Sequence, residues 1–390
     1  MMLAIINPIA VAAVALLATF CQATPPLSCA ALRVSEGVCR DTPNGVVLAD
    51  DAEMANYWAA IATEGEERFQ RHFGQQPTPY AVLVGDKINP VSESGVSGAE
   101  TVALQAELRA AGAVHILPWY SAEQRARLAP ASRGEDARLD GARASGVNQD
   151  SAAAHELGHR WAVAAFWPDA GPALGSHYGG PGPDWFDEAS AVLMEDEGLA
   201  DGRREGFRRT MASPGGARPK PLADYFVDGH PVEALARGLL SDQLAARGLS
   251  GVDLGEAEPG APNRRIIRRE DLPPGAVART RPPAELGGAG VTGQGQTFSV
   301  TTTTSALLDP ADQATALMFY GQARVLADFL IEQSGDEMIF RRIGEQLAAG
   351  RTMDDWLAVE GEALHLGSSV AELDEIWRSW LTANYPATEA

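Results

Sequence analysis

The chain has 390 residues, which is enough to bury one large apolar core or two smaller ones. Its formal net charge at pH 7 is −21, from 52 acidic and 31 basic residues, and this balance argues against nucleic acid or an anionic membrane surface as a partner. An acidic surface of this kind mainly favours solubility.

The first residues form an apolar run that is typical of a secretory leader. No charged residue occurs from Leu3 to Phe20, and prolines follow soon afterwards. The run lacks the usual Lys or Arg near its start, but cleavage after Ala23 fits the small residues there. We therefore expect a signal peptide over residues 1–23 and a secreted or periplasmic protein with no stable membrane span after cleavage. An uncleaved anchor is the alternative, because a run of this length barely spans a bilayer.

Two cysteines, Cys29 and Cys39, remain once the leader is removed. A close, even pair in an exported chain predicts a disulfide that closes a short loop. We expect residues 24 to about 50 to be an extended lead-in tied by this disulfide. A metal site elsewhere in the chain would then contain no thiolate.

Helix and strand patterns alternate in the next part of the chain. Ala52–Phe73 carries a helical stripe of apolar residues. Two short apolar runs, Tyr80–Gly85 and Ala113–Leu117, predict strands, with a helix over Ala99–Ala111 between them. The pattern predicts an N-terminal α+β part over residues 24–147, with Ala113–Leu117 as the edge strand beside a cleft.

An H-E-x-x-H motif follows in the stretch Ser151–Trp167. Residues four apart on a helix project from one face, so His155 and His159 are a natural pair of zinc ligands. Glu156 would lie beside the metal, where it can take a proton from water as a general base. An ordinary helix with two unrelated histidines is the alternative.

A second helix, predicted over Trp185–Glu195, follows a loop rich in Gly and Pro. Glu188, near its start, can complete a site of two histidines and one carboxylate that leaves a fourth zinc position open. Glu195, two turns further along, would point the same way and accept a hydrogen bond from a ligand histidine without binding the metal itself. An exposed position beside Asp196 and Glu197 is the alternative for Glu195.

These residues resemble the gluzincin pattern of zinc metallopeptidases. In aminopeptidase N-like enzymes, H-E-x-x-H is followed by W-L-N-E-G-x-A and a further Glu, and this chain has Trp-Phe-Asp-Glu-Ala-Ser-Ala at 185–191 and then Glu195. The resemblance implies that His155, His159 and Glu188 bind zinc and that Glu156 is the base. The 28 residues between His159 and Glu188 form a longer spacing than in those enzymes, which the Gly/Pro loop accommodates.

The C-terminal third returns to helical patterns after a weakly organised region. A helix is expected over Pro231–Arg247, and an irregular surface insertion over about 251–305. Four helices are then predicted, over Ala311–Gln333, Glu337–Ala349, Met353–Glu362 and Leu373–Leu381. This series resembles the helical half of the peptidase-MA-like families.

Tyr320 begins a Tyr-Gly-Gln-Ala stretch that resembles the Y-x-K-G stretch of aminopeptidase N-like enzymes loosely. The resemblance implies that its hydroxyl stabilises the oxyanion of the tetrahedral intermediate. A core tyrosine packed beside Phe319 is the alternative. The G-x-M-E-N stretch that holds the substrate amine in those relatives is absent, so an endopeptidase is favoured over an aminopeptidase.

The sequence therefore predicts an α+β fold: a small N-terminal mixed sheet packed on a mainly helical zincin-type part over residues 148–390. The expected function is Zn²⁺-dependent hydrolysis of peptide bonds in a peptide or protein substrate. A zinc-binding interaction protein without catalysis, and a surface-anchored binding module in which the motif is accidental, are the alternatives. Nothing in the sequence indicates an oligomeric state.

Overall fold

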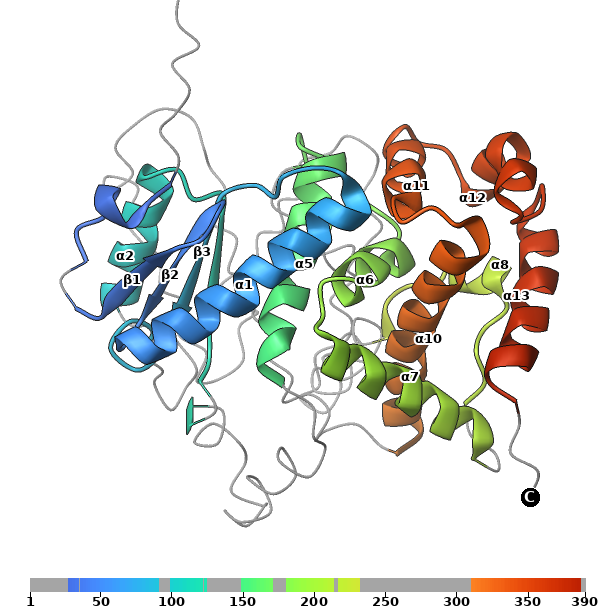
Figure 1. Cartoon of the computed structure of the whole chain (residues 1–390), viewed down its shortest axis with the longest axis horizontal. Coiled ribbons are helices and arrows are strands. Elements are labelled where there is room, and N and C mark those ends of the chain that lie inside the picture. Colours follow the sequence, from blue (N-terminus) through green and yellow to red (C-terminus); the bar gives the residue numbers. More distant parts are fainter. Residues whose placement is uncertain are drawn as a thin grey trace, which may run out of the picture.

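The structure is a computed structural model, and it describes residues 27–34, 36–90, 99–121, 123–124, 149–170, 180–213, 217–231 and 310–386. The predicted leader, the predicted helix beyond residue 231 and the predicted insertion over 251–305 lie outside the described residues. Figure 1 shows a small sheet at one end of the molecule and a larger helical part at the other. This is the mixed α+β architecture that the sequence predicts.

The sheet has four strands in the order β1-β2-β3-β4 (Figure 1). β1 and β2 pair antiparallel, whereas β2–β3 and β3–β4 pair in parallel. β4 is therefore an edge strand, at the place that the sequence predicts but shifted by two residues. The strand bounds are β1 Val38–Asp41, β2 Gly45–Ala49, β3 Tyr80–Val84 and β4 His115–Trp119.

The hairpin of β1 and β2 stands where the sequence predicts only an extended lead-in up to about residue 50. All five residues of β2 are buried, because this strand lies between β1 and β3. A short apolar run after Asn44-Gly45 is the signal that could have identified it. The predicted disulfide is present: Cys29, in a 3-10 turn over Cys29–Ala31, is bonded to Cys39 on β1.

Helices cover both faces of the sheet. Alternate side chains such as Val47 and Val82 face α1 (Ala52–Phe73) and the main core, whereas Val46 and Ala81 face Leu108 of α2 (Ala99–Ala110). Side chains of consecutive strand residues point to opposite faces, so each short strand contributes to two apolar layers. α1 then carries the main core from the sheet to the helical part.

Close packing joins α1 to the helix that carries the H-E-x-x-H motif, α5 (Ala152–Phe166). α1 begins after Asp51, whose carboxylate accepts a hydrogen bond from the backbone N–H of Met54 at 2.9 Å. Further along α1, a Cβ added at Gly65 would lie 3.0 Å from the Cβ of Ala154. A glycine at this position therefore lets α5 lie directly against α1.

The other helices form the rest of the molecule. Their bounds are α6 Asp184–Val192, α7 Glu197–Ala212, α8 Leu222–Tyr225, α10 Pro310–Ser334, α11 Ile339–Ala348, α12 Met353–Trp356 and α13 Val370–Asn384. A π-helical turn over Leu357–Gly361 and a 3-10 turn over Glu362–Leu364 continue α12. The four C-terminal helices agree with the predicted ones apart from their ends. Among the described residues, no helix is both long and apolar enough to cross a bilayer.

α7 is a helix that the sequence analysis missed. Its sequence contains Gly198, Gly202 and Gly206 and many charges, which weaken a helical pattern. Only Ala200 and Phe207, seven residues apart on one face, are buried in it. The helix packs extensively along α10 and is joined to it by ion pairs such as that of Arg204 with Asp328, but its few buried apolar residues are too sparse for a recognisable periodicity.

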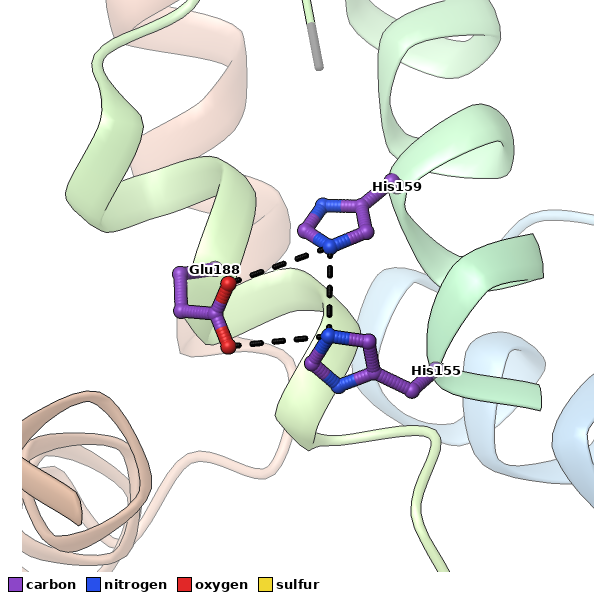
Figure 2. A group of neighbouring side chains, drawn as sticks. All are labelled: His155, His159 and Glu188. Carbon is purple, nitrogen blue, oxygen red and sulfur yellow. Dashed lines mark hydrogen bonds and ion pairs between the residues drawn. The ribbon is translucent and has the colours of Figure 1, made fainter. Parts of the chain in front are cut away.

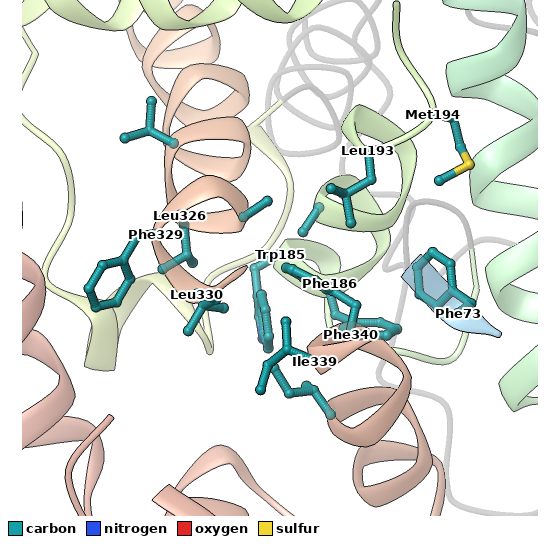
Figure 3. Close-up of a cluster of buried hydrophobic side chains, with 14 of the residues drawn as sticks. Phe73, Trp185, Phe186, Leu193, Met194, Leu326, Phe329, Leu330, Ile339 and Phe340 are labelled. Carbon is teal, nitrogen blue, oxygen red and sulfur yellow. The ribbon is translucent and has the colours of Figure 1, made fainter. Parts of the chain in front are cut away.

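α6 lies in the centre of the apolar core. All nine of its residues are buried, and Figure 3 shows Trp185 and Phe186 between side chains of α10 and α11. The Phe186 ring lies 6.2 Å from that of Phe340 on α11 and 5.7 Å from that of Phe166 on α5. α6 is therefore fixed from both sides, which determines the position of the acidic residues that it carries.

Candidate metal centre

The two histidines of the motif face the same side of α5, as the sequence predicts (Figure 2). Both are buried, and the Nε2 atoms of His155 and His159 are 3.2 Å apart. A tetrahedral zinc ion bound at ordinary Zn–N lengths would hold two ligand nitrogens about 3.3 Å apart. The helix thus places both nitrogens at the separation that a shared metal ion requires.

Glu188 approaches these nitrogens from α6 (Figure 2). Its Oε1 lies 3.6 Å from Nε2 of His155, and its Oε2 lies 3.8 Å from Nε2 of His159. The carboxylate is fully buried, and neither oxygen accepts a hydrogen bond from any residue that the structure describes. Ligand atoms of these three residues lie within 4.8 Å of one another, so the group fits a metal ion that would satisfy the buried carboxylate.

Each histidine has a carboxylate close to its other ring nitrogen, Nδ1. The Nδ1 atom of His155 lies 2.9 Å from Glu195, and the Nδ1 atom of His159 lies 2.9 Å from Asp187. A carboxylate there holds the Nδ1–H tautomer and leaves the Nε2 lone pair for a metal ion. Asp187 is a residue that the sequence analysis missed, although it immediately precedes Glu188.

Glu195 reaches His155 from beyond the end of α6. The sequence predicts it on the helix, but α6 ends at Val192 and Glu195 follows a turn. Its side chain is fully buried, which rules out the alternative of an exposed glutamate. Glu195 therefore lies against His155, as the sequence predicts, but it follows α6 and does not belong to it.

Hydrogen bonds from three other elements hold the turn that carries Glu195. The backbone N–H of Asp196 donates to Oγ of Ser151 at 2.7 Å. The side chain of Arg68 donates to the carbonyl of Met194 at 3.2 Å, and that of Arg324 donates to the carbonyl of Val192 at 3.1 Å. Ser151 occupies the N-cap position of α5 but makes no side-chain capping hydrogen bond there. Its hydroxyl instead connects the start of α5 to the residue after Glu195.

The buried charges shift the pKa values of the metal-free site. Burial alone would raise the pKa of Glu188, but the neighbouring imidazoles outweigh burial and lower it to about 2. Burial alone would lower the pKa of His159, but Asp187 outweighs burial and raises it to about 9. Glu188 is therefore ionised at neutral pH, which is the state that a metal ion requires of a carboxylate ligand.

Glu156 and Tyr320 lie beside the candidate ligands and not among them. Glu156 is half-buried on α5, and its charge contributes to the raised pKa of His159. Tyr320, on α10, is half-buried, and burial and the charge of Glu188 both raise the pKa of its hydroxyl. The hydroxyl therefore stays protonated at neutral pH and can donate a hydrogen bond, while its neighbour Phe319 is the residue packed in the core.

His230 is a further residue at the site that the sequence analysis missed. Its imidazole is fully buried, with Nε2 3.6 Å from Oε2 of Glu188 and its ring 5.4 Å from that of Tyr320. Its backbone N–H donates to Asp184 at 2.6 Å. His230 approaches Glu188 but does not belong to the group whose ligand atoms all lie close together. No motif surrounds it in the sequence, so only the fold could reveal it.

No protein-family model matches the chain, and neither a curated protein nor a solved structure is significantly similar to it. The function of the protein must therefore be inferred from the H-E-x-x-H motif and from the geometry around it.

Proposed function

We propose that this protein is a zinc-dependent peptidase of the gluzincin type. The observation that carries the proposal is the buried group of His155, His159 and Glu188, with the general-base position of the motif occupied by Glu156. A metal site that served stability alone would have no use for a carboxylate at that position. The presence of Glu156 therefore favours catalysis over the alternative of a non-catalytic zinc protein.

Zinc is the metal that suits these ligands best. Two imidazole nitrogens and one carboxylate oxygen form a common catalytic zinc set, which leaves one position open for water or substrate. The described ligand group contains no thiolate, which suits an oxidising compartment, and the disulfide between Cys29 and Cys39 supports export of the chain. We propose a secreted or periplasmic location on this basis together with the apolar N-terminus.

The protein's own groups have distinct tasks in peptide hydrolysis. Zinc, when bound, would polarise the scissile carbonyl and make water more acidic. Glu156 takes the proton that the attacking water loses and delivers it to the leaving amine. The protonated Tyr320 hydroxyl donates a hydrogen bond to the oxygen of the carbonyl as negative charge develops on it. Asp187 and Glu195 keep the two histidines in one orientation throughout.

The substrate we propose is an extended peptide. β4 is an edge strand that contacts α5, and no strand pairs with its outer side among the described residues. An extended chain can add to such an edge through backbone hydrogen bonds, which would bring a peptide bond towards the face of α5 that carries the motif. This mode suits cleavage within a chain, so we favour an endopeptidase.

The substitution Glu156→Gln tests the function directly. We expect the variant to bind one zinc ion per chain with unchanged affinity and to hydrolyse peptides about 10²–10⁴-fold more slowly, because only the proton acceptor is lost. Zinc is measured by elemental analysis, and hydrolysis with a library of internally quenched peptides. Glu188→Gln is the control that should lose the metal itself.

Two outcomes would contradict the proposal. Absence of zinc from protein purified without chelators would remove the metal centre. Stoichiometric zinc without cleavage of any peptide, or full activity of Glu156→Gln, would instead support the non-catalytic alternative or a different base.

A further inference from the structure

Arg203, on α7, donates hydrogen bonds to the carboxylate of Glu195, which contacts His155. Its Nη2 donates to Oε1 of Glu195 at 2.6 Å, and its Nε lies 3.1 Å and 3.2 Å from the two carboxylate oxygens. The same Oε1 of Glu195 lies 2.9 Å from Nδ1 of His155. A continuous chain of contacts thus runs from the candidate metal ligand through Glu195 to the guanidinium.

The same guanidinium packs on the ring of Tyr320. The Cζ atom of Arg203 lies 4.8 Å from the ring centroid, which is a cation–π distance. α7 and α10 can approach this closely because the residue after Tyr320 is a glycine: a Cβ added at Gly321 would lie 3.0 Å from the Cβ of Phe207. Arg203 therefore contacts both the support of a metal ligand and the residue that we propose as the oxyanion donor.

The pairing gives Glu195 an arginine partner, which Asp187 does not have among the described residues. A buried carboxylate without a cation is costly, and a two-pronged guanidinium contact keeps it ionised and in one orientation. Asp187, by contrast, pairs with His159 and with no arginine among the described residues. The two histidines are therefore held with unequal rigidity.

We propose that Arg203 is a positioning residue that fixes His155, through Glu195, and the ring of Tyr320 at the same time. One side chain then determines both the affinity for the metal and the place of the tyrosine hydroxyl. This inference rests on the proposed metal centre and adds a residue that the H-E-x-x-H pattern does not contain.

Zinc affinity tests the first half of the proposal without any activity measurement. We expect Arg203→Met to weaken zinc binding about 10- to 100-fold, the usual effect of losing a group that supports a ligand histidine. Arg203→Lys keeps the charge but not the two-pronged geometry, so its affinity should lie in between. Affinity is measured by competition with a chelating dye, and Arg203→Lys keeps the test available if the Met variant does not fold.

Arg204 provides a matched control on the same helix. It pairs with Asp328 of α10 at 2.8 Å and contacts neither Glu195 nor Tyr320 in any described interaction. Arg204→Met removes a bridge between α7 and α10 and should leave zinc affinity within about twofold of the parent. An equal loss in both variants would overturn the proposal, because the effect would then be general loosening of α7.

A double-mutant cycle tests whether Arg203 acts through Glu195. In the Glu195→Gln background, Arg203→Met should weaken zinc binding by less than about twofold, because the link is already broken. If the losses of zinc affinity caused by Arg203→Met and by Glu195→Gln simply multiplied in the double variant, Arg203 would not act through Glu195. Wild-type protein without zinc would contradict the proposed function instead, so the two failures are distinguishable.

Fluorotyrosine labelling tests the second half. The ¹⁹F resonance of Tyr320, identified among the seven tyrosines by its loss in Tyr320→Phe, should shift or broaden in Arg203→Met and remain in place in Arg204→Met. In parallel, Arg203→Met measured at saturating zinc should lower kcat more than it changes KM. An unchanged resonance and an unchanged kcat at full zinc occupancy would overturn the link to Tyr320.

Discussion

At the scale of single residues, the two histidines differ in their surroundings although they belong to one motif. The carboxylate that contacts Nδ1 of His155 is shared with an arginine, whereas Asp187, which contacts Nδ1 of His159, pairs with no arginine among the described residues. Asp187 raises the pKa of His159 to about 9 in the metal-free protein, so this imidazole carries a proton at neutral pH. A zinc ion at the proposed site would have to displace that proton before it could bind.

The pH dependence of zinc binding follows from this shift. A histidine with a folded-state pKa of about 9 stabilises the metal-free fold fully below its unfolded value of 6.5 and loses that contribution as pH rises through 9. Zinc competes with the proton, so affinity should rise with pH up to about 9, by at most about tenfold per unit for one proton. Calorimetry in buffers of different ionisation enthalpy measures the proton released. Asp187→Asn should reduce that release at pH 7.5, and no proton release from the parent protein would refute the assignment.

Replacement of Tyr320 distinguishes a catalytic role of its hydroxyl from a packing role of its ring. Tyr320→Phe should lower kcat by about 10²–10³-fold with little change in KM or zinc content, because one hydrogen-bond donor to the developing charge is lost. Tyr225→Phe is the matched control: its buried hydroxyl donates to the carbonyl of Phe319 at 3.2 Å. That variant should lose about 1 kcal/mol of stability and keep its kcat. An unchanged kcat in Tyr320→Phe would return Tyr320 to a packing role.

At the scale of elements, the distance between α5 and α6 depends on the glycine inside the motif. A Cβ added at Gly158 would lie 2.7 Å from Cγ of Met194 and 3.0 Å from Cα of Ala191. These contacts are too short for a methyl group, so a larger residue must push the helices apart. Glu188 would move with α6, away from the histidines on α5.

Gly158→Ala should therefore weaken zinc binding even though no ligand is changed. We expect at least about a tenfold loss of affinity together with about 1–3 kcal/mol of destabilisation from overpacking. Gly206→Ala on α7 is the control, because nothing lies within 4 Å of its added Cβ. That substitution should be neutral or stabilising by up to about 1 kcal/mol. Retained zinc affinity in Gly158→Ala, measured alongside thermal unfolding, would show that α6 can adjust without cost.

Strongly periodic or motif-bearing segments were predictable, and sparsely patterned ones were not. α1 occurs over the predicted residues, because its apolar stripe is long and Gly74 ends it in a left-handed conformation. α7 and the β1–β2 hairpin were missed, since one is rich in glycine and charge and the other is only a few residues long. The ligand group could be predicted because the spacing of His155 and His159 is local and Glu188 begins a recognisable helix.

The supporting residues of the site required the fold. Arg203 and His230 lie in segments without a motif and reach Glu195 and Glu188 only through tertiary packing. Even Glu195 was placed on the wrong element, because a helix pattern does not indicate where the last turn ends. Sequence patterns thus predicted the groups that would touch a metal ion better than the groups that hold them in place.

At the scale of the whole molecule, the candidate metal centre lies where the main helices of the core meet. α5 contacts α1 and α6, and α6 contacts α10, so a ligand bound between α5 and α6 links the sheet-bearing part to the C-terminal helices. Binding to the folded state alone stabilises it by mass action, by about 4 kcal/mol at a thousand times the dissociation constant. Removal of the metal should therefore affect the entire fold.

Treatment with a chelator should lower the melting temperature of the wild-type protein, and added zinc should restore it. The same treatment should leave the melting temperature of Glu188→Gln unchanged, since that variant has no tightly bound metal to lose. Differential scanning calorimetry of the two proteins, with and without zinc, measures the difference. A wild-type melting temperature that is insensitive to chelator and to zinc would argue against a metal centre in this position.

The burial of α6 between α5 and α10 also bears on how the protein matures. All three candidate ligands lie within the first 188 residues, but the helix that presents Glu188 packs against α10 and α11, which begin at Pro310 and Ile339. A nascent or truncated chain that ends before α10 would contain all three ligands and still lack the packing that holds them together. We therefore expect the proposed metal centre to form only once α10 and α11 have packed against α6.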